Sequence, residues 1–288
     1  MTIKVKKIND IEVKKVKLSN QINPKEILGY NLFKKIFSNI WLCSKKHSGK
    51  STVIANILDK CINKSTIVVF FCPTINKDET YIKMKKKLKK RGIMYDAYED
   101  IFDEEGGNIV DKYLHMLIER ERENQEEDDE EQEEIETIEE YRGLIKFNEE
   151  PPKEKKKKEE EPKIKKNKIR SPDYIFIFDD LGEALKHKSI YRLLSKNRHF
   201  NCKVILSTQS PNDLAGRSRK QIEYSLIFRS FDREQLKELY RALDLSVNIE
   251  DFYKLYDYAT LNPYNFLYIS NDNEFRKNFN QRLEIIHN

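Results

Sequence analysis

The sequence predicts an α/β fold in which a mostly parallel sheet is covered by helices on both faces and is interrupted by a charged insert. Three observations predict it. Short apolar runs alternate with helical patterns along the chain. A small polar loop joins the first apolar run to a helix through Gly49 and Lys50. A later run of aromatic and β-branched residues ends in Asp179 and Asp180.

The expected strands and helices follow one another in regular order. Strands are expected at 36–43, 66–72, 174–178, 203–207 and 224–228, with a late strand at 266–269. Helices are expected at 50–60, 78–91, 188–197 and 232–243. Continuous apolar runs are typical of strands that are buried on both faces of a parallel sheet. The alternation therefore predicts parallel strands with helices packed on either side.

The loop between the first strand and the first helix has the layout of a P-loop, whose pattern is G-x-x-x-x-G-K-[ST]. Gly49 lets the backbone approach a phosphate, and the N-terminus of the helix attracts its negative charge. Lys50 is expected to reach the β- and γ-phosphates, and the Ser51 hydroxyl to bind Mg²⁺. The alternative is a chance Gly-Lys-Ser triplet at a helix N-terminus. The expected nucleotide-binding residues are Ser44, Lys45, Lys46, His47, Ser48, Gly49, Lys50, Ser51 and Thr52.

Asp179 and Asp180 end a predicted central strand, where ligands bind in open α/β sheets. Asp179 is expected to hold Mg²⁺, and Asp180 to orient or deprotonate an attacking water. Adjacent aspartates are also common in turns, so the pair is informative only together with the upstream Gly-Lys-Ser-Thr. The two motifs together predict a P-loop NTPase that binds ATP and Mg²⁺.

Gln209 follows the strand at 203–207 and is expected to contact the γ-phosphate or to hold the attacking water. The alternative is a glutamine in an ordinary loop. Arg198 precedes the same strand and is the candidate for an arginine finger that acts on a neighbouring subunit's nucleotide. Arg217 and Arg219 compete for this role, and any single arginine is more often a surface charge. Asp180, Gln209 and Arg198 are thus the catalytic candidates.

Charge runs divide the chain. Glutamate dominates 119–140 and lysine dominates 151–168, so neither block can bury enough apolar surface to fold on its own. We expect an N-terminal arm at 1–30, an ATPase domain at 31–118 and 171–288, and a low-complexity insert at 119–170 that is part helical and part mobile. The lysines could contact DNA phosphates. A solvated linker, partly neutralised by the acidic block, is the favoured interpretation.

The composition indicates an intracellular globular enzyme that is not secreted. The 288 residues include 54 basic and 49 acidic ones, for a modest net charge of +5. The four cysteines are scattered without the spacing of metal ligands, which indicates free thiols in a reducing compartment. No apolar stretch approaches the about 20 residues of a membrane span, and no signal peptide is visible, so no membrane partner is expected.

Four motifs, in the order SKKHSGKST, FFCPTINKDETY, IFIFDDL and NRHFNCKVILSTQS, resemble those of the genome-packaging ATPases of the FtsK/HerA superfamily. Within it the chain is most similar to the poxvirus-type ATPases of large DNA viruses, virophages and polinton-like elements. The resemblance covers roughly 36–228, interrupted by the insert, and extends to FLYISNDNEFRKNF. It implies an oligomeric, usually ring-forming ATPase that drives double-stranded DNA into a preformed capsid.

The resemblance also implies roles for individual residues. It assigns Lys50 and Ser51 to the nucleotide and Mg²⁺, and Asp179 to Mg²⁺. Asp180 takes the position of the catalytic carboxylate, and Gln209 that of the sensor glutamine. Arg198 lies in a segment that resembles the family's arginine-histidine stretch. Ser44, in place of the first P-loop glycine, and the long insert depart from the family pattern.

The leading hypothesis is therefore an ATP-dependent DNA translocase that packages a viral genome. Its expected partners are double-stranded DNA, capsid proteins and further copies of the chain in a homo-oligomeric ring. Its expected location is the viral factory in the host cytoplasm, and also the virion. Two alternatives stay open: another P-loop nucleic-acid motor such as a helicase, and a capsid assembly factor that uses the nucleotide only as a conformational switch.

Overall fold

The computed structural model describes residues 23–123 and 169–286. The described strands are β1 (Asn39–Cys43), β2 (Ile67–Phe71), β3 (Tyr95–Tyr98), β4 (Tyr174–Asp179), β5 (Cys202–Thr208), β6 (Tyr224–Phe228), β7 (Phe266–Ser270), β8 (Phe275–Lys277) and β9 (Gln281–Leu283). The α-helices are α1 (Lys50–Cys61), α2 (Glu79–Arg91), α4 (Lys188–Lys196), α5 (Gly216–Arg219), α6 (Arg233–Leu243) and α7 (Ile249–Ala259). Residues 109–123 form a further helix. Short 3-10 helices are η1 (Pro24–Glu26), η3 (Gly182–Lys186) and η4 (Pro211–Asp213).

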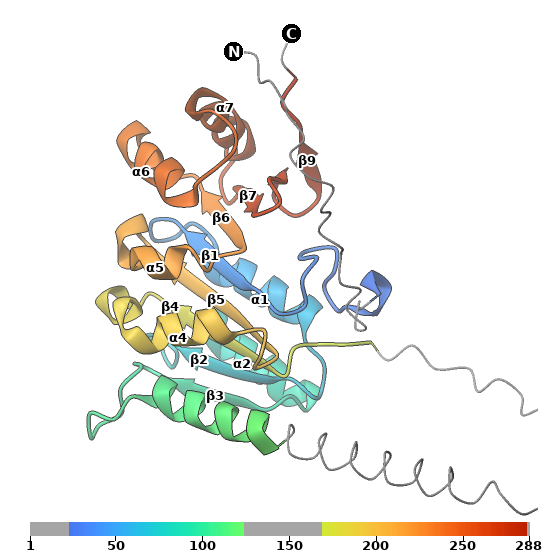
Figure 1. Ribbon diagram of the computed structural model, residues 1–288, viewed down its shortest axis with the longest axis vertical. Coiled ribbons are helices and arrows are strands. Elements are labelled where there is room, and N and C mark those ends of the chain that lie inside the picture. Colours follow the sequence, from blue (N-terminus) through green and yellow to red (C-terminus); the bar gives the residue numbers. More distant parts are fainter. Residues whose placement is uncertain (1–22, 124–168, 287–288) are drawn as a thin grey trace, which may run out of the picture.

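The described strands form one nine-stranded sheet in the order β3-β2-β4-β5-β1-β6-β7-β8-β9 (Figure 1). Every pairing from β3 to β6 is parallel. The pairings from β6 to β9 are antiparallel. The predicted fold class, a mostly parallel sheet with helices on both faces, is therefore confirmed.

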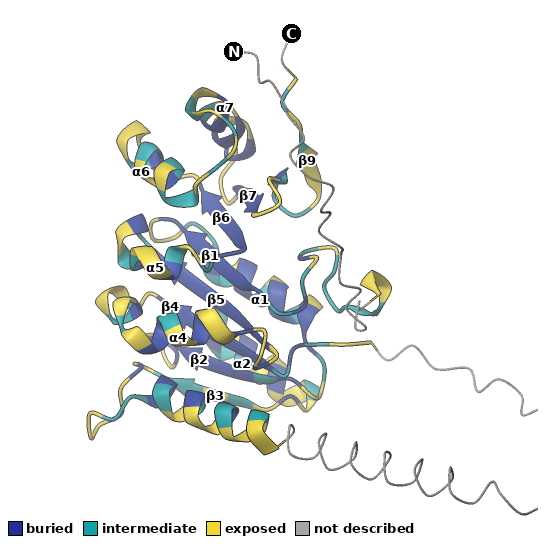
Figure 2. Cartoon of the chain, viewed as in Figure 1, coloured by how far each residue is buried: buried dark blue, intermediate teal, exposed yellow. Residues whose placement is uncertain are grey.

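Each central strand contributes side chains to both faces of the sheet, because successive residues of a strand point in opposite directions. On one face Trp41 and Phe178 pack with α4, α6, α7 and the helix at 109–123. On the other face Leu42 and Ile177 pack with α1 and α2. In Figure 2 the central strands are dark blue, and exposed residues lie on the outer sides of the helices and in loops. Burial on both faces explains why the strand sequences are continuous apolar runs.

Several elements differ from the prediction. The edge strand β3, the helix α7 and the strands β8 and β9 were not predicted, and β7 runs antiparallel to β6. β1 begins at Asn39, three residues later than expected. The residues just before it are tied to β5 by a side chain, because Lys203 Nζ donates to Ser38 Oγ (2.7 Å) and to the Lys35 carbonyl (3.2 Å).

The predicted arm and insert are described only in part, since residues 1–22, 124–168 and 287–288 lie outside the described residues. Residues 23–30 contain η1 and turns, where an extended arm was expected. Ile27 forms a parallel bridge with Arg170, and Leu28 N donates to the Arg170 carbonyl (3.0 Å). The helix at 109–123 enters the predicted insert, and the division into domains stays a prediction. All four cysteines are buried and free.

We expect Gly29→Ala to lower the free energy of unfolding by about 2–4 kcal/mol. Gly29 has a φ of +74°, and a Cβ atom there would lie 2.3 Å from Cys61 Sγ at the end of α1. Gly106 is the matched control, because its φ is +80° and nothing lies within 4 Å of the corresponding position. Gly106→Ala should cost about 1 kcal/mol. Denaturant unfolding measures both, and equal losses would contradict the close packing of Gly29 on α1.

Candidate nucleotide-binding site

The predicted site residues meet at the edge of the sheet where β1, β4 and β5 end. β5 pairs in parallel with both other strands, and the register sets Cys43 beside Thr208 and Asp179 beside Ser207. Because neighbouring strands lie about 4.8 Å apart, β1 and β4 are about 10 Å apart across β5. The loop that begins at Ser44 and the acidic pair therefore face a common space.

Loop 44–49 is fastened to β5 and to α1. Ser44 N donates to the Thr208 carbonyl (3.1 Å). Lys50 Nζ donates to the Ser44 carbonyl (2.7 Å) and to the Thr208 carbonyl (3.4 Å). Gly49, the N-cap of α1, has a φ of 92°, a conformation that other residues resist. The buried Lys50 ammonium therefore lies beside a helix N-terminus, where its charge and the helix dipole both favour an anion.

Ser44 uses its side chain inside the loop. The residue is fully buried, and its hydroxyl contacts Ser48 Oγ and the Lys45 carbonyl (3.2 Å). Ser48 Oγ also donates to the Lys45 carbonyl (2.9 Å). His47 has a left-handed backbone with a φ of 61°. The serine that replaces the first glycine of the pattern thus helps to close the loop.

Asp179 is a buried carboxylate with one unsatisfied oxygen. It is 6% exposed, and its Oδ2 accepts a hydrogen bond from the Tyr81 hydroxyl (2.6 Å). Among the described residues, neither Asp179 Oδ1 nor Ser207 Oγ has a hydrogen-bond partner of good geometry. Burial raises the pKa of Asp179, while the nearby Ser207 and Tyr81 hydroxyls and the Lys50 charge lower it.

The free oxygen of Asp179 fits a divalent cation. A buried polar atom without a partner costs free energy, and a hard cation such as Mg²⁺ prefers oxygen ligands. Ser51, at the start of α1, and Asp179 both lie close enough to Tyr81 to influence the pKa of its hydroxyl. The carboxylate and the Ser51 hydroxyl are therefore the residues of this chain that would hold Mg²⁺.

Tyr81 is a site residue that was not predicted. It lies on α2, is fully buried, and joins Asp179 to the start of α1. Burial and the Asp179 charge raise the pKa of Tyr81 well above its ordinary value, so the phenol stays a proton donor. Tyr81 is the last residue of the motif FFCPTINKDETY, but it was given no role there, because its helical spacing with Met84 and Leu88 is equally typical of core packing.

Asp180 and Gln209 form a polar pair beside Asp179. Gln209 Nε2 donates to Asp180 Oδ1, and Gln209 N donates to Asp213 Oδ2 (3.1 Å). Asp180 is exposed, has a left-handed backbone with a φ of 57°, and donates its N–H to the Ser207 carbonyl (3.2 Å). An exposed carboxylate held by an amide is suited to orient a water molecule. The structure therefore brings Lys50, Asp179, Asp180 and Gln209 together.

Arg198 lies at the opposite end of the central strands from the P-loop. It precedes β5, whereas the loop and the acidic pair follow the ends of β1 and β4. A strand of this length separates the two edges by about 20 Å. Arg198 Nη2 pairs with the buried Glu223, which also accepts a hydrogen bond from Asn39 N (2.8 Å). At this distance Arg198 does not reach the P-loop of its own chain. Its side chain is 64% exposed and is therefore open to a neighbour.

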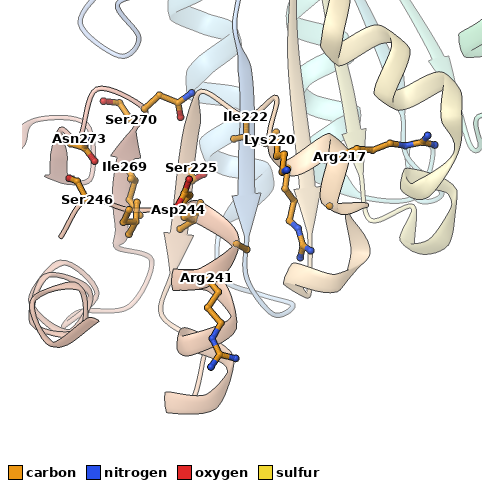
Figure 3. Close-up of a pocket in the computed structure, with 16 residues that line it drawn as sticks. Arg217, Lys220, Ile222, Ser225, Arg241, Asp244, Ser246, Ile269, Ser270 and Asn273 are labelled. Carbon is orange, nitrogen blue, oxygen red and sulfur yellow. The ribbon is translucent and has the colours of Figure 1, made fainter. Parts of the chain in front are cut away.

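The two competing arginines lie beside a separate cavity of about 1130 Å³, between α5, α6 and the β6–β7 pair. Figure 3 shows the Arg217 side chain directed away from this cavity, and its guanidinium lies 5.1 Å from the centre of the Tyr191 ring. Arg219 Nη1 donates to the Pro211 carbonyl (3.0 Å). The cavity adjoins the beginning of β6, and it shares no residue with the P-loop, the acidic pair or Gln209.

Asp179→Asn should raise the free energy of unfolding near pH 7, in the absence of nucleotide and metal. The pKa of Asp179 is raised in the folded protein, so the ionised carboxylate destabilises the fold. This cost is absent below the ordinary pKa of the group and fully present above the raised pKa. The gain should therefore disappear toward about pH 3.

Denaturant unfolding between about pH 3 and pH 8 measures this dependence. Asp180→Asn is the matched control, because Asp180 is exposed and should give no comparable gain. A loss of stability at pH 7, or a gain that does not change with pH, would contradict the burial cost assigned to Asp179.

Solved structures of similar proteins include a genome packaging NTPase, B204, from Sulfolobus turreted icosahedral virus 2 in complex with ATP-gammaS. It is 15% identical, and the likeness covers 88% of this chain and 100% of that chain with a TM-score of 0.47. The DNA-packaging ATPase B204 from Sulfolobus turreted icosahedral virus is 14% identical, with 87% and 98% covered and a TM-score of 0.47. The cytoplasmic domain of the type VII secretion ATPase EccC from Thermomonospora curvata is 13% identical, with 87% and 25% covered and a TM-score of 0.40. Likenesses this weak assign no activity to the chain.

The family profile described as Poxvirus A32 protein matches residues 133–275, just under half of the chain. The matched region contains Asp179, Asp180 and Gln209 and begins after the P-loop. No curated protein sequence matches the chain. Among the described residues, none of the helices has the length and hydropathy of a membrane span. The resemblance to the poxvirus-type ATPases is thereby confirmed over residues 133–275, where the chain matches the Poxvirus A32 protein profile.

Proposed function

We propose that this protein is an ATP-dependent DNA translocase that packages a viral genome into a preformed capsid. The observation that carries the proposal is the meeting of Lys50, Asp179 and the Asp180–Gln209 pair at one edge of the sheet. These groups are suited to a triphosphate, its metal ion and an attacking water, respectively. The match to the poxvirus A32 family supports the viral setting.

The P-loop binds the phosphates of ATP through residues 44–52. Lys50 Nζ, which donates to the carbonyls of Ser44 and Thr208, turns toward the γ-phosphate when a triphosphate is bound. Ser51 and Asp179 hold Mg²⁺, which supplies neutralisation of the phosphate charge during the transfer. Because the Lys50 ammonium and the Asp179 carboxylate are buried, they act in a site from which water is largely excluded.

Asp180 and Gln209 prepare the water that attacks the γ-phosphate. The hydrogen bond from Gln209 Nε2 keeps the Asp180 carboxylate in one orientation, at the exposed side of the site. Asp180 then accepts a proton from the water, while the Gln209 amide holds the water in line. Asp213 fixes the backbone of Gln209 by accepting its N–H (3.1 Å).

The motor works as a homo-oligomeric ring in which one subunit completes the site of the next. Arg198 is 64% exposed and lies at the edge opposite its own P-loop, which fits a finger that acts on a neighbour. Its bond to the buried Glu223 holds the guanidinium in place. The partners are double-stranded DNA and capsid proteins, and the setting is a viral factory in the host cytoplasm or the virion.

The exposed face of α2 supplies a surface for the DNA backbone. Lys86, Lys89 and Lys90 are exposed and have no ion pair among the described residues. By contrast, Lys87 and Arg91 pair with Asp59. Unpaired lysines bind phosphates without reading the base sequence, as a translocase that moves along DNA requires.

Linear duplex DNA should stimulate ATP hydrolysis by the wild-type chain. Lys50→Ala should lower turnover at least about 100-fold, because the positive charge that Lys50 places beside the γ-phosphate is lost. Ser44→Gly should leave turnover roughly unchanged, since the Ser44 hydroxyl bonds only within the loop. Steady-state phosphate release measures all three chains with and without DNA.

Replacing Lys86, Lys89 and Lys90 together by glutamate should weaken the stimulation of ATP hydrolysis by DNA and make it less sensitive to salt.

Equal turnover of the wild-type chain with and without duplex DNA would contradict a translocase. Unchanged turnover in Lys50→Ala would contradict the nucleotide site itself.

Mixing two inactive variants tests the finger. Arg198→Ala should bind ATP but hydrolyse it at least about 100-fold more slowly. Assembled with Lys50→Ala subunits, it should recover part of the activity, because some interfaces then combine an intact Lys50 with an intact Arg198. Arg217→Ala is the control, because it should hydrolyse ATP at about the wild-type rate without any mixing. No recovery in any mixture, with ring assembly intact, would exclude Arg198 as the finger.

A further inference from the structure

The site has a γ-phosphate side and a nucleoside side. Asp179 ends β4, Asp180 follows it and Gln209 follows β5, so all three lie on one side of β1. β6 and β7 lie on the other side of β1. A triphosphate in the P-loop that directs its γ-phosphate toward the acidic pair therefore directs its nucleoside toward β6 and β7. This step rests on the proposed nucleotide site.

The loop at 260–265, between α7 and β7, borders the nucleoside side. Apart from the residues next to Gly49 in the chain, Tyr264 is the side chain nearest to a Cβ atom built at Gly49, which would lie 3.3 Å from Tyr264 Cδ1. The loop after β6 reaches the P-loop as well, since Lys45 N donates to Ser230 Oγ (3.2 Å). Tyr264 is nevertheless 70% exposed. An open aromatic ring thus borders the P-loop at the helix start.

The backbone of this loop is held in an unfavourable conformation. Tyr264 has a φ of 66°, which is rare for a bulky residue. It follows Pro263 in a turn that is closed by Asn265 N, which donates to the Asn262 carbonyl (3.3 Å). Its surroundings are fixed, because Arg229 Nη1 donates to the Leu261 carbonyl (2.8 Å) and Asn278 Nδ2 donates to Asn265 Oδ1 (3.0 Å). The turn therefore presents Tyr264 in a fixed position, with most of the residue open to solvent.

We propose that Tyr264 is the platform on which the base of the bound nucleoside triphosphate stacks. A phenol ring offers a flat, rigid face with little conformational entropy to lose, and any purine can stack on it. Leu261, in the same loop, is also an exposed apolar residue (64%). The P-loop binds the phosphates, and Tyr264 binds the base on the side of β1 that faces β6 and β7.

Two ligands separate this role from phosphate binding. Tyr264→Ala should weaken the binding of Mg·ATP-gammaS by about 5- to 150-fold, the range for loss of one stacked base. The same variant should bind inorganic tripolyphosphate, which has no base, as tightly as wild type. Tyr264→Phe keeps the ring and should bind both like wild type. Tyr258, on α7 and 58% exposed, gives the matched control Tyr258→Ala, which should bind both unchanged.

Isothermal titration calorimetry with the full chain measures each affinity. Tyr264→Ala that binds ATP-gammaS like wild type would overturn the stacking role and leave the proposed nucleotide site standing. An equal loss for ATP-gammaS and tripolyphosphate would also overturn it, because the substitution would then act on the P-loop itself. A wild-type chain that binds neither ligand would overturn the proposed function, and the stacking role with it.

Discussion

The site depends on the parallel pairing of β5 with β1 on one side and β4 on the other. This register places the ends of the three strands at one edge, so that Thr208 supports Ser44 and Lys50 while Ser207 lies beside Asp179. Parallel strands cannot be joined by tight turns, so each connection carries a helix to the faces of the sheet. α1 and α2 arrive in this way, one with the phosphate-binding N-terminus and the other with Tyr81. One backbone constraint thus assembles residues that are far apart in sequence.

The electrostatics of the site favour occupancy by a charged ligand. Burial lowers the pKa of Lys50 and raises that of Asp179, so each group is held where its charge is disfavoured. A phosphate beside Lys50 and a cation beside Asp179 would supply the missing counter-charges. Ligand binding should therefore stabilise the fold as well as prepare the reaction. The protein without ligand therefore has a lower free energy of unfolding, which is the usual cost of a preorganised active site.

The central strands and the P-loop could be predicted from the sequence because their signals are local. A strand buried on both faces is a continuous apolar run, and Gly49-Lys50 lies directly between such a strand and a helix. The antiparallel strands β8 and β9 were missed, since each has only three residues and carries little periodic pattern. The start of β1 was placed too early because the apolar pattern does not reveal that Lys203 anchors the preceding loop.

The residues that complete the site were hidden for a different reason. Tyr81 and Tyr264 reach it through tertiary contacts, one from an apolar helix face and the other from a strained loop. Tyr81 ends the motif FFCPTINKDETY, but the motif does not reveal its contact with Asp179, and Tyr264 lies in none of the four motifs. Arg198 was recognised by its place in a motif. Its ion pair with Glu223, which directly precedes β6, could not be predicted from the sequence. Local chemistry is therefore readable from the sequence, whereas the walls of the site follow from the fold.

The central claim is that Asp179 and Ser51 hold the metal ion of a nucleotide bound by Lys50. Crystals of the full chain grown with Mg²⁺ and ATP-gammaS test it most directly. The account predicts the γ-phosphate beside Lys50 Nζ, and Mg²⁺ held by Ser51 Oγ and by the Asp179 carboxylate, directly or through water. Nucleotide bound elsewhere, for example in the cavity beside α5 and α6, or a metal ion remote from Asp179, would contradict it.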